Sequence, residues 1–175
     1  HNVADTDPSL PGNRAWGRAI TERIATSTAG AALDAEHTIT PAQGLDTATL
    51  VNARLAPDML TLAGQVQRAS DASKLAAARL GGMTAPSFAD TESTYDELLQ
   101  RIAKTRDFLA SVDRAAIDGQ EAREVRLKVG DGEIVFDAQR YLLQFAIPNF
   151  FFHVTTAYDV LRHVGVPVGK RDYLG

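Results

Sequence analysis

Cysteine is missing from this sequence, and its absence excludes several kinds of chemistry. A chain without thiols forms no disulfide, has no thiolate nucleophile and offers zinc no cysteine ligand. The N-terminal residues also lack a basic segment followed by an apolar core, which would mark a secretory signal peptide. These features fit a reducing compartment, and we predict a cytoplasmic protein.

An excess of basic residues and a long apolar run are missing as well. The chain has 18 basic and 22 acidic residues, a net charge of -4, whereas nucleic-acid binders normally present a basic face. The longest apolar run, about 145–154, is too short and too interrupted to span a bilayer. We therefore predict no nucleic-acid partner and no membrane partner. Nucleophile, phosphate-loop and His-Glu zinc motifs are absent too, so nothing supports a hydrolase or a nucleotide-dependent enzyme.

What is present is the composition of an ordinary globular domain. The 175 residues include 45% hydrophobic and 23% charged residues, enough for one core. We predict a single helical domain over 1–175, with a loose lead-in at 1–13 and a C-terminal tail at 166–175. No internal repeat divides it.

Helical spacing of apolar residues recurs along most of the chain. It predicts four main helices, over about 14–36, 57–80, 95–112 and 137–163. A short helical turn at 46–54 can be capped by Asp46 or Thr47. Pro57 fits the first turn of the second helix, and Gly81-Gly82 ends it.

Helix termini carry further signals in the second half of the chain. Thr91 or Ser93 can cap the third helix, and Pro148 either restarts or kinks the last one. Between these two helices the period changes to two at 124–129, and Gly130-Asp131-Gly132 forms a turn before 133–136. The fold prediction is therefore all-α, an up-and-down four-helix bundle with a short β-hairpin before the last helix.

The most apolar and aromatic stretch, 148–163, contains the candidate site. Asn149 and His153 are four residues apart, so on a helix both lie on the face that packs. Gln65 borders the seam of the second helix. Buried amide and imidazole groups need partners. The partner is a ligand, a metal or another side chain: His153 can simply bond to Gln65, Asn149 or a backbone carbonyl, and Asn149 can serve the start of its helix.

Three further features belong to this hypothesis. Tyr158 can reach a pocket beside His153, which makes these two the candidate catalytic residues. Asp58 follows Pro57, where a carboxylate suits the helix dipole, and it is a candidate substrate-binding residue together with Gln65 and Asn149. The consecutive rings of 150–152 cannot all face one core, so at least one covers the hairpin, lines a cavity or meets a second subunit.

The chain resembles the DinB/YfiT-like superfamily of four-helix bundles, in an uncharacterised branch catalogued as a domain of unknown function. The resemblance covers about 52–175 and is carried by 52–59 (NARLAPDM), 65–67 (QVQ), 148–158 (PNFFFHVTTAY), 161–163 (LRH) and 169–172 (GKRD).

Many DinB-like proteins bind a divalent metal through three histidines, one on the second helix and two on the last, and some are thiol-dependent transferases. Counted back from Leu161-Arg162, the resemblance places one histidine position at His153 and the other at Asn149. The position on the second helix falls at Gln65. The resemblance thus implies that amides replace two of the three metal ligands.

These observations lead to one main hypothesis and two alternatives. The main hypothesis is a bundle that binds a small molecule in an apolar central pocket, with no cofactor and with His153 in proton transfer. The first alternative keeps a divalent metal such as zinc or nickel on His153, with Asp58 or Asp71 replacing the missing ligands. The second is a non-catalytic interaction protein, for example a homodimer whose subunits meet through their phenylalanines.

Overall fold

The computed structural model describes residues 46–174, so the predicted helix at 14–36 and the lead-in at 1–13 lie outside the described residues. In order, the elements are α3 (Thr47–Asn52), α4 (Leu62–Gly81), α5 (Tyr95–Ser111), the 3-10 turn η3 (Arg114–Ala116), β1 (Glu124–Val129), β2 (Gly132–Asp137), α6 (Ala138–Tyr141), the π-helical turn η4 (Leu142–Ala146), α7 (Ile147–His163) and α8 (Lys170–Leu174). None of these described helices combines the length and the apolar character needed to span a bilayer.

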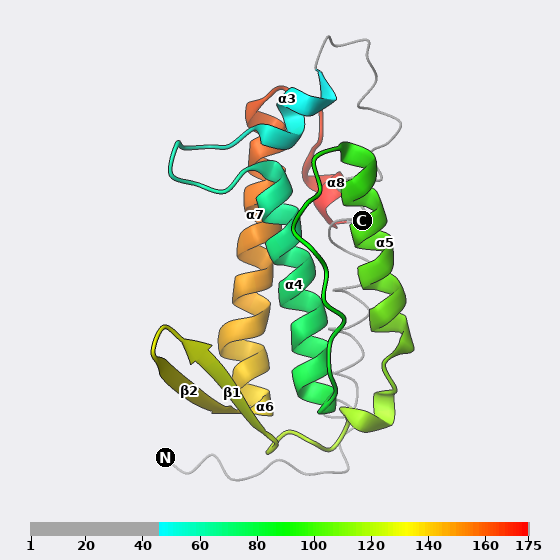
Figure 1. Cartoon of the computed structure of the whole chain (residues 1–175), viewed down its shortest axis with the longest axis vertical. Helices are drawn as coiled ribbons and strands as arrows, with labels where there is room; N and C mark the ends of the chain where they lie inside the picture. Colours follow the sequence, from blue (N-terminus) through cyan, green and yellow to red (C-terminus); the bar gives the residue numbers. More distant parts are fainter. Residues whose placement is uncertain (1–45, 175) are drawn as a thin grey trace.

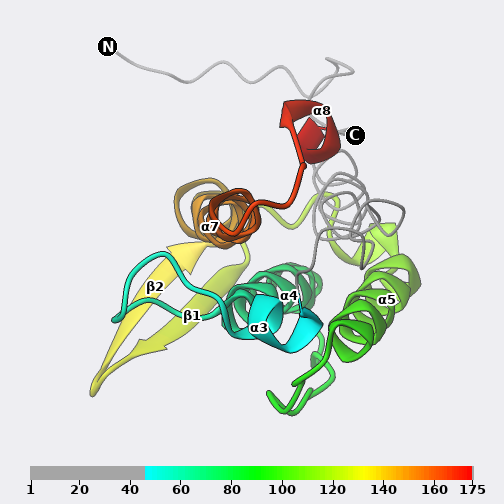
Figure 2. The same cartoon turned by 90° about the horizontal axis from the view of Figure 1, so that it is seen from above.

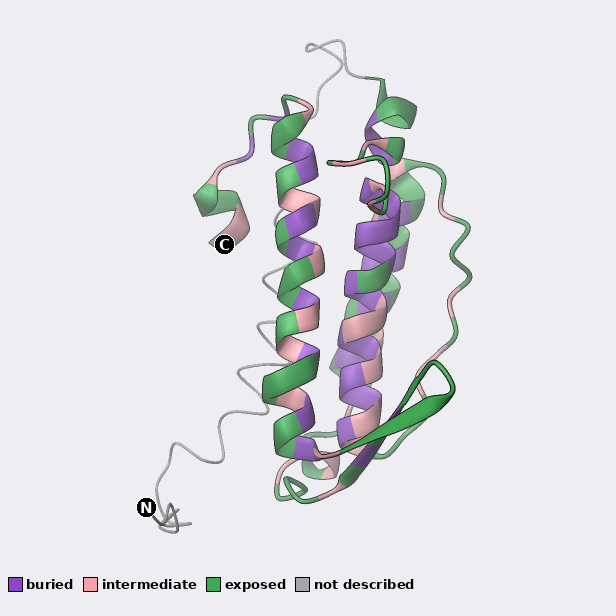
Figure 3. Cartoon of the chain, turned by 90° about the vertical axis from the view of Figure 1, so that its left-hand side faces the viewer, coloured by how far each residue is buried: buried purple, intermediate pink, exposed green. Residues whose placement is uncertain are grey.

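Helix α4 lies at the centre of the described part. It packs against α7 on one side and α5 on the other (Figures 1 and 2). It is buried along most of its length, whereas α7 alternates buried and exposed strips (Figure 3). The upper core joins Leu62 and Val66 to Leu98 and Ile102 of α5 and to Val160 and Leu161 of α7.

The direction of the helices corrects the up-and-down prediction. Helices α4 and α5 run the same way, and α7 runs against them (Figure 1). Residues 83–93, which we call the strap, return along the length of α4 before α5 begins. Helix α4 has 20 residues and is therefore about 30 Å long. Residues 83–93, when extended, reach about 36 Å, so the strap can span the helix. The sequence prediction placed the end of one helix at Gly81-Gly82 and the next cap at Thr91 or Ser93, and it expected consecutive helices to alternate in direction.

The start of α4 differs from the prediction, and its end agrees with it. Pro57 does not open the helix, because Thr61 is the N-cap and its side chain accepts a hydrogen bond from the Gly64 amide. Asp58 therefore lies in the exposed loop before α4 rather than in its first turn. At the other end Gly82 adopts the left-handed conformation (φ 66°) that terminates many helices.

The caps of α3 and α5 show how local chemistry sets helix starts. Asp46 caps α3 as expected. For α5 the predicted caps Thr91 and Ser93 are wrong, since Thr94 is the N-cap and forms a reciprocal capping box with Glu97. Hydrogen bonds from the backbone of Ser93 and of Thr94 hold the pKa of Glu97 below its usual value.

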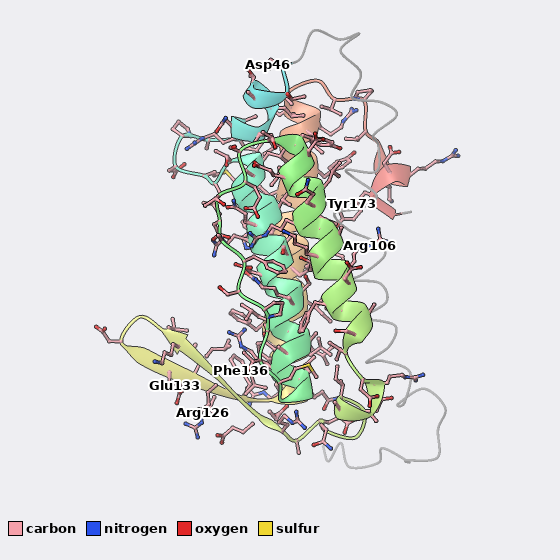
Figure 4. The ribbon with its side chains drawn as sticks, turned by 45° about the vertical axis from the view of Figure 1, so that its right-hand side comes forward. Asp46, Arg106, Arg126, Glu133, Phe136 and Tyr173 are labelled. Carbon is pink, nitrogen blue, oxygen red and sulfur yellow. The ribbon has the colours of Figure 1, made fainter. Side chains whose placement is uncertain are left out.

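The predicted hairpin is present as two antiparallel strands with Val125 opposite Phe136 and Leu127 opposite Ile134. Val125 and Leu127 are buried against α4 and α6. In Figure 4 Phe136 lies next to the helices, while Arg126 and Glu133 lie away from them on the other face of the hairpin. The bundle supplies the apolar surface that a lone hairpin needs.

Pro148 is accommodated without breaking the last helix. It lies in the first turn of α7, where its missing N–H costs least, and the π-helical turn η4 directly precedes it. A π-helical turn inserts extra chain into a helix and thereby changes which residues of the following helix face the core. The short helix α8, which the sequence analysis had treated as a tail, follows the buried Val166 and Val168.

Candidate functional site

Gln65 and His153 meet where α4 and α7 pack together. The Oε1 atom of Gln65 lies 2.9 Å from Nδ1 of His153. Gln65 is 2% exposed, and the imidazole is half-buried. The partner that the sequence required for these two polar groups is thus each other, one of the alternatives left open above.

The bond fixes the tautomer of His153. An amide oxygen only accepts hydrogen bonds, so Nδ1 carries the proton and Nε2 keeps a lone pair. Burial, and secondly the positive charge of Arg68, lowers the pKa of His153 below its ordinary value of 6.5. The lowered pKa favours the neutral imidazole, in which Nε2 is the nitrogen that can accept a proton.

Asn149 and Phe152 border this pair on α7. Asn149 lies one turn before His153, half-buried, and its amide makes no hydrogen bond to another residue of 46–174. The Phe152 ring meets the His153 ring edge-on at 5.3 Å between centroids and is 59% exposed. The expected division of the three rings is present, since Phe150 is buried and Phe151 and Phe152 are exposed.

The structure does not bring Tyr158 or Asp58 to the pair. Tyr158 is five residues after His153, which turns it by about 140° around α7. Its ring packs edge-on against Tyr173 of α8 at 5.8 Å between centroids. Asp58 lies in the exposed loop between α3 and α4.

A buried arginine on the other side of α4 was missed by the sequence analysis. Arg101 of α5 has a side chain that is 1% exposed and ion-pairs with three carboxylates, at 2.9 Å from Asp71, 3.0 Å from Asp90 and 3.0 Å from Glu92. It also donates a hydrogen bond to the backbone oxygen of Ala89. Since Ala89, Asp90 and Glu92 all belong to the strap, Arg101 ties the strap to the bundle.

Other side chains complete this network. The Lys74 ammonium lies 4.3 Å from the centre of the Phe88 ring and bonds to Asp71 at 2.5 Å. Burial raises the pKa of Glu92, but hydrogen bonds from the backbone, Arg101 and Gln67 outweigh it and hold that pKa below the usual value. The sequence signal for this network was weak: Asp90 and Glu92 follow Pro86 in a segment that has no helical or strand period.

Comparison with known proteins identifies the family. The sequence matches the family described as "Domain of unknown function (DUF1993)" over residues 20–174. The chain belongs to the DUF1993 family. A crystal structure of a DinB family member protein from Shewanella denitrificans is similar to it, with a TM-score of 0.82 and 34% sequence identity, over 93% of this chain and 96% of that chain. The predicted resemblance to DinB-like proteins, in a branch of unknown function, is confirmed. A search of curated proteins gave no significant match.

The donor set of this DUF1993 chain does not fit the metal that the resemblance implies. Two of the three ligand positions hold neutral amides, which are weak ligands for zinc or nickel, and the Gln65 amide oxygen is already bonded to Nδ1 of His153. Asp71, a suggested replacement ligand, accepts bonds from Arg101 and Lys74 instead. Within 46–174 no three His, Asp or Glu side chains lie close enough together to hold an ion.

Proposed function

We propose that this DUF1993 protein binds a small polar organic molecule beside Gln65, Asn149 and His153, and that His153 exchanges a proton with it. The observation that carries this proposal is the 2.9 Å contact between Gln65 Oε1 and His153 Nδ1. That contact orients the imidazole and leaves Nε2 as an acceptor, the arrangement of a general base. No step of the reaction involves a metal.

Each neighbour has a separate task in this proposal. Gln65 positions the imidazole, and the unbonded amide of Asn149 offers the ligand one acceptor and two donors. The exposed Phe152 ring gives the ligand an apolar surface next to these polar groups. Such a combination suits a small aromatic molecule with one or two polar substituents.

The protonation state of His153 sets the pH range of binding and catalysis. Because burial and Arg68 lower its pKa, the imidazole is more than half neutral at pH 6.5, where a free histidine is half protonated. We therefore expect the base to remain active at pH 6.5 and to lose activity only at more acidic pH.

Replacing His153 by alanine tests the proposal. In a thermal-shift and NMR screen of phenols, benzamides and benzoates, wild type should bind at least one compound and His153→Ala should bind none. His163→Ala is the matched control, because His163 is exposed in the last turn of α7. Binding that survives in His153→Ala would place the ligand elsewhere.

A homodimer is the second candidate. It is favoured by two exposed rings, Phe145 (37% exposed) and Phe152 (59% exposed), which a second subunit could cover. They are seven residues apart along the continuous helix. We expect a dimer in sedimentation equilibrium that Phe152→Ser weakens by at least about tenfold, since that change removes most of a buried ring's contribution of about 1.5–3 kcal/mol. A monomeric wild type would rule this candidate out.

A further inference from the structure

Arg68 is the charged residue nearest in sequence to the Gln65–His153 pair on α4. It lies three residues after Gln65, so the two side chains are neighbours on the helix surface. Its side chain is 43% exposed. Its charge also reaches His153, whose pKa it lowers. A guanidinium therefore lies close enough to the imidazole to disfavour its protonated form.

The present partners of Arg68 leave it free to change partners. Its closest contact is the carboxylate of Asp90 in the strap, and Asp71 is farther away at 3.6 Å. Asp71 is also bonded to Arg101 and Lys74, and Asp90 also pairs with Arg101 at 3.0 Å. Both carboxylates thus keep a cation if Arg68 turns away. Because the Arg68–Asp90 pair is exposed, it contributes little stability.

The other nearby cations cannot take this role. Arg101 and Lys74 are almost fully buried and are held by Asp71 and the strap carboxylates. Among the arginines of 46–174, Arg68 is thus the one that we expect a ligand at the Gln65–His153 pair to meet. A single guanidinium matches a planar, singly charged carboxylate through two parallel hydrogen bonds.

We propose that Arg68 makes this site selective for small molecules that carry a carboxylate, which takes the guanidinium from Asp90 while the rest of the ligand contacts His153 and Asn149. This inference rests on the proposed function and adds the chemical class of the ligand. It also gives the strap a link to the site, because ligand binding releases one of the bonds of Asp90.

The test compares benzoate with benzamide, two probes of the same size of which only one is charged. Binding is measured by NMR titration of wild type, Arg68→Gln and Arg106→Gln. Arg106 is an exposed arginine on α5 and is the matched control (Figure 4). Wild type and Arg106→Gln should bind benzoate about tenfold or more tightly than benzamide, the range expected for hydrogen bonds to a charged group.

The Arg68→Gln variant shows whether Arg68 causes the preference for benzoate. Arg68→Gln should abolish this preference by weakening benzoate about tenfold while leaving benzamide unchanged. Arg68→Lys, which keeps the charge but not the fork, should retain part of the preference. Equal binding of both probes, or a preference that Arg68→Gln does not alter, would overturn the inference and leave the proposed function standing if His153→Ala still abolishes binding. Failure of both probes to bind wild type would overturn the inference, and the proposed function would be overturned as well if no compound of the wider screen bound.

Discussion

Replacing Arg101 by methionine should lower the free energy of unfolding by about 3 kcal/mol. The methionine fills much of the volume but leaves Asp71, Asp90 and Glu92 without their shared cation. These carboxylates are 21%, 36% and 13% exposed, so water offsets part of the penalty and the value lies at the lower end of the range for broken buried pairs.

Urea denaturation of wild type, Arg101→Met and Arg106→Met measures this effect. Arg106→Met changes an exposed residue of the same helix and should alter stability by less than about 0.5 kcal/mol. A loss below about 1 kcal/mol for Arg101→Met would show that the strap network contributes no more than an ordinary surface pair.

Replacing Tyr141 by alanine should cost about 4 kcal/mol, the largest effect that we expect for one residue. Tyr141 is 1% exposed and joins the hairpin to the bundle. Its ring lies 6.2 Å from that of Phe136 and 5.9 Å from that of Phe145, and its hydroxyl accepts a hydrogen bond from Arg79 of α4.

Tyr141→Phe separates the ring from the hydroxyl. This variant keeps both ring contacts and loses only the bond from Arg79, so it should cost about 1 kcal/mol. Hydrogen exchange should also show faster exchange for the amides of β1 and β2 in Tyr141→Ala than in Tyr141→Phe. Similar unfolding free energies for the two variants would mean that the ring does not hold the hairpin.

Local chemistry made part of the fold predictable. The hairpin, the cap at Asp46 and the end of α4 at Gly82 depend on residues close in sequence, and all three were predicted. The predicted start of α4 was wrong because Pro57 and Thr61 both suit a helix N-terminus. The hydrogen bond from the backbone N–H of Leu62 to the backbone oxygen of Ala53 favours the later start.

The path of the strap could not be predicted from residues close in sequence. It depends on Arg101 meeting carboxylates that are up to 30 residues away in sequence, and no local pattern encodes that meeting. A segment that lacks helical and strand period is compatible with a short reversal and with a long return, so its sequence pattern does not distinguish the two paths. For this reason the parallel course of α4 and α5 was missed.

Helical periodicity also decided how much of the site was predictable. The face shared by Asn149 and His153 follows from their spacing of four, and Gln65 was placed at the same seam. The same periodicity turns Tyr158 toward α8, so counting residues around α7 would have separated it from His153. Arg68 was overlooked although its position three residues after Gln65 makes it a neighbour of the pair.

The proposed function depends most on Gln65 holding His153 as a neutral base with Nε2 free. An NMR pH titration of the histidine ring nitrogens tests it directly, with His153→Ala and His163→Ala assigning the signals. We expect a proton on Nδ1 of His153 and a pKa below 6.5, because burial and the charge of Arg68 both disfavour the cation. A His153 pKa of 6.5 or higher, or a neutral form with the proton on Nε2, would contradict it.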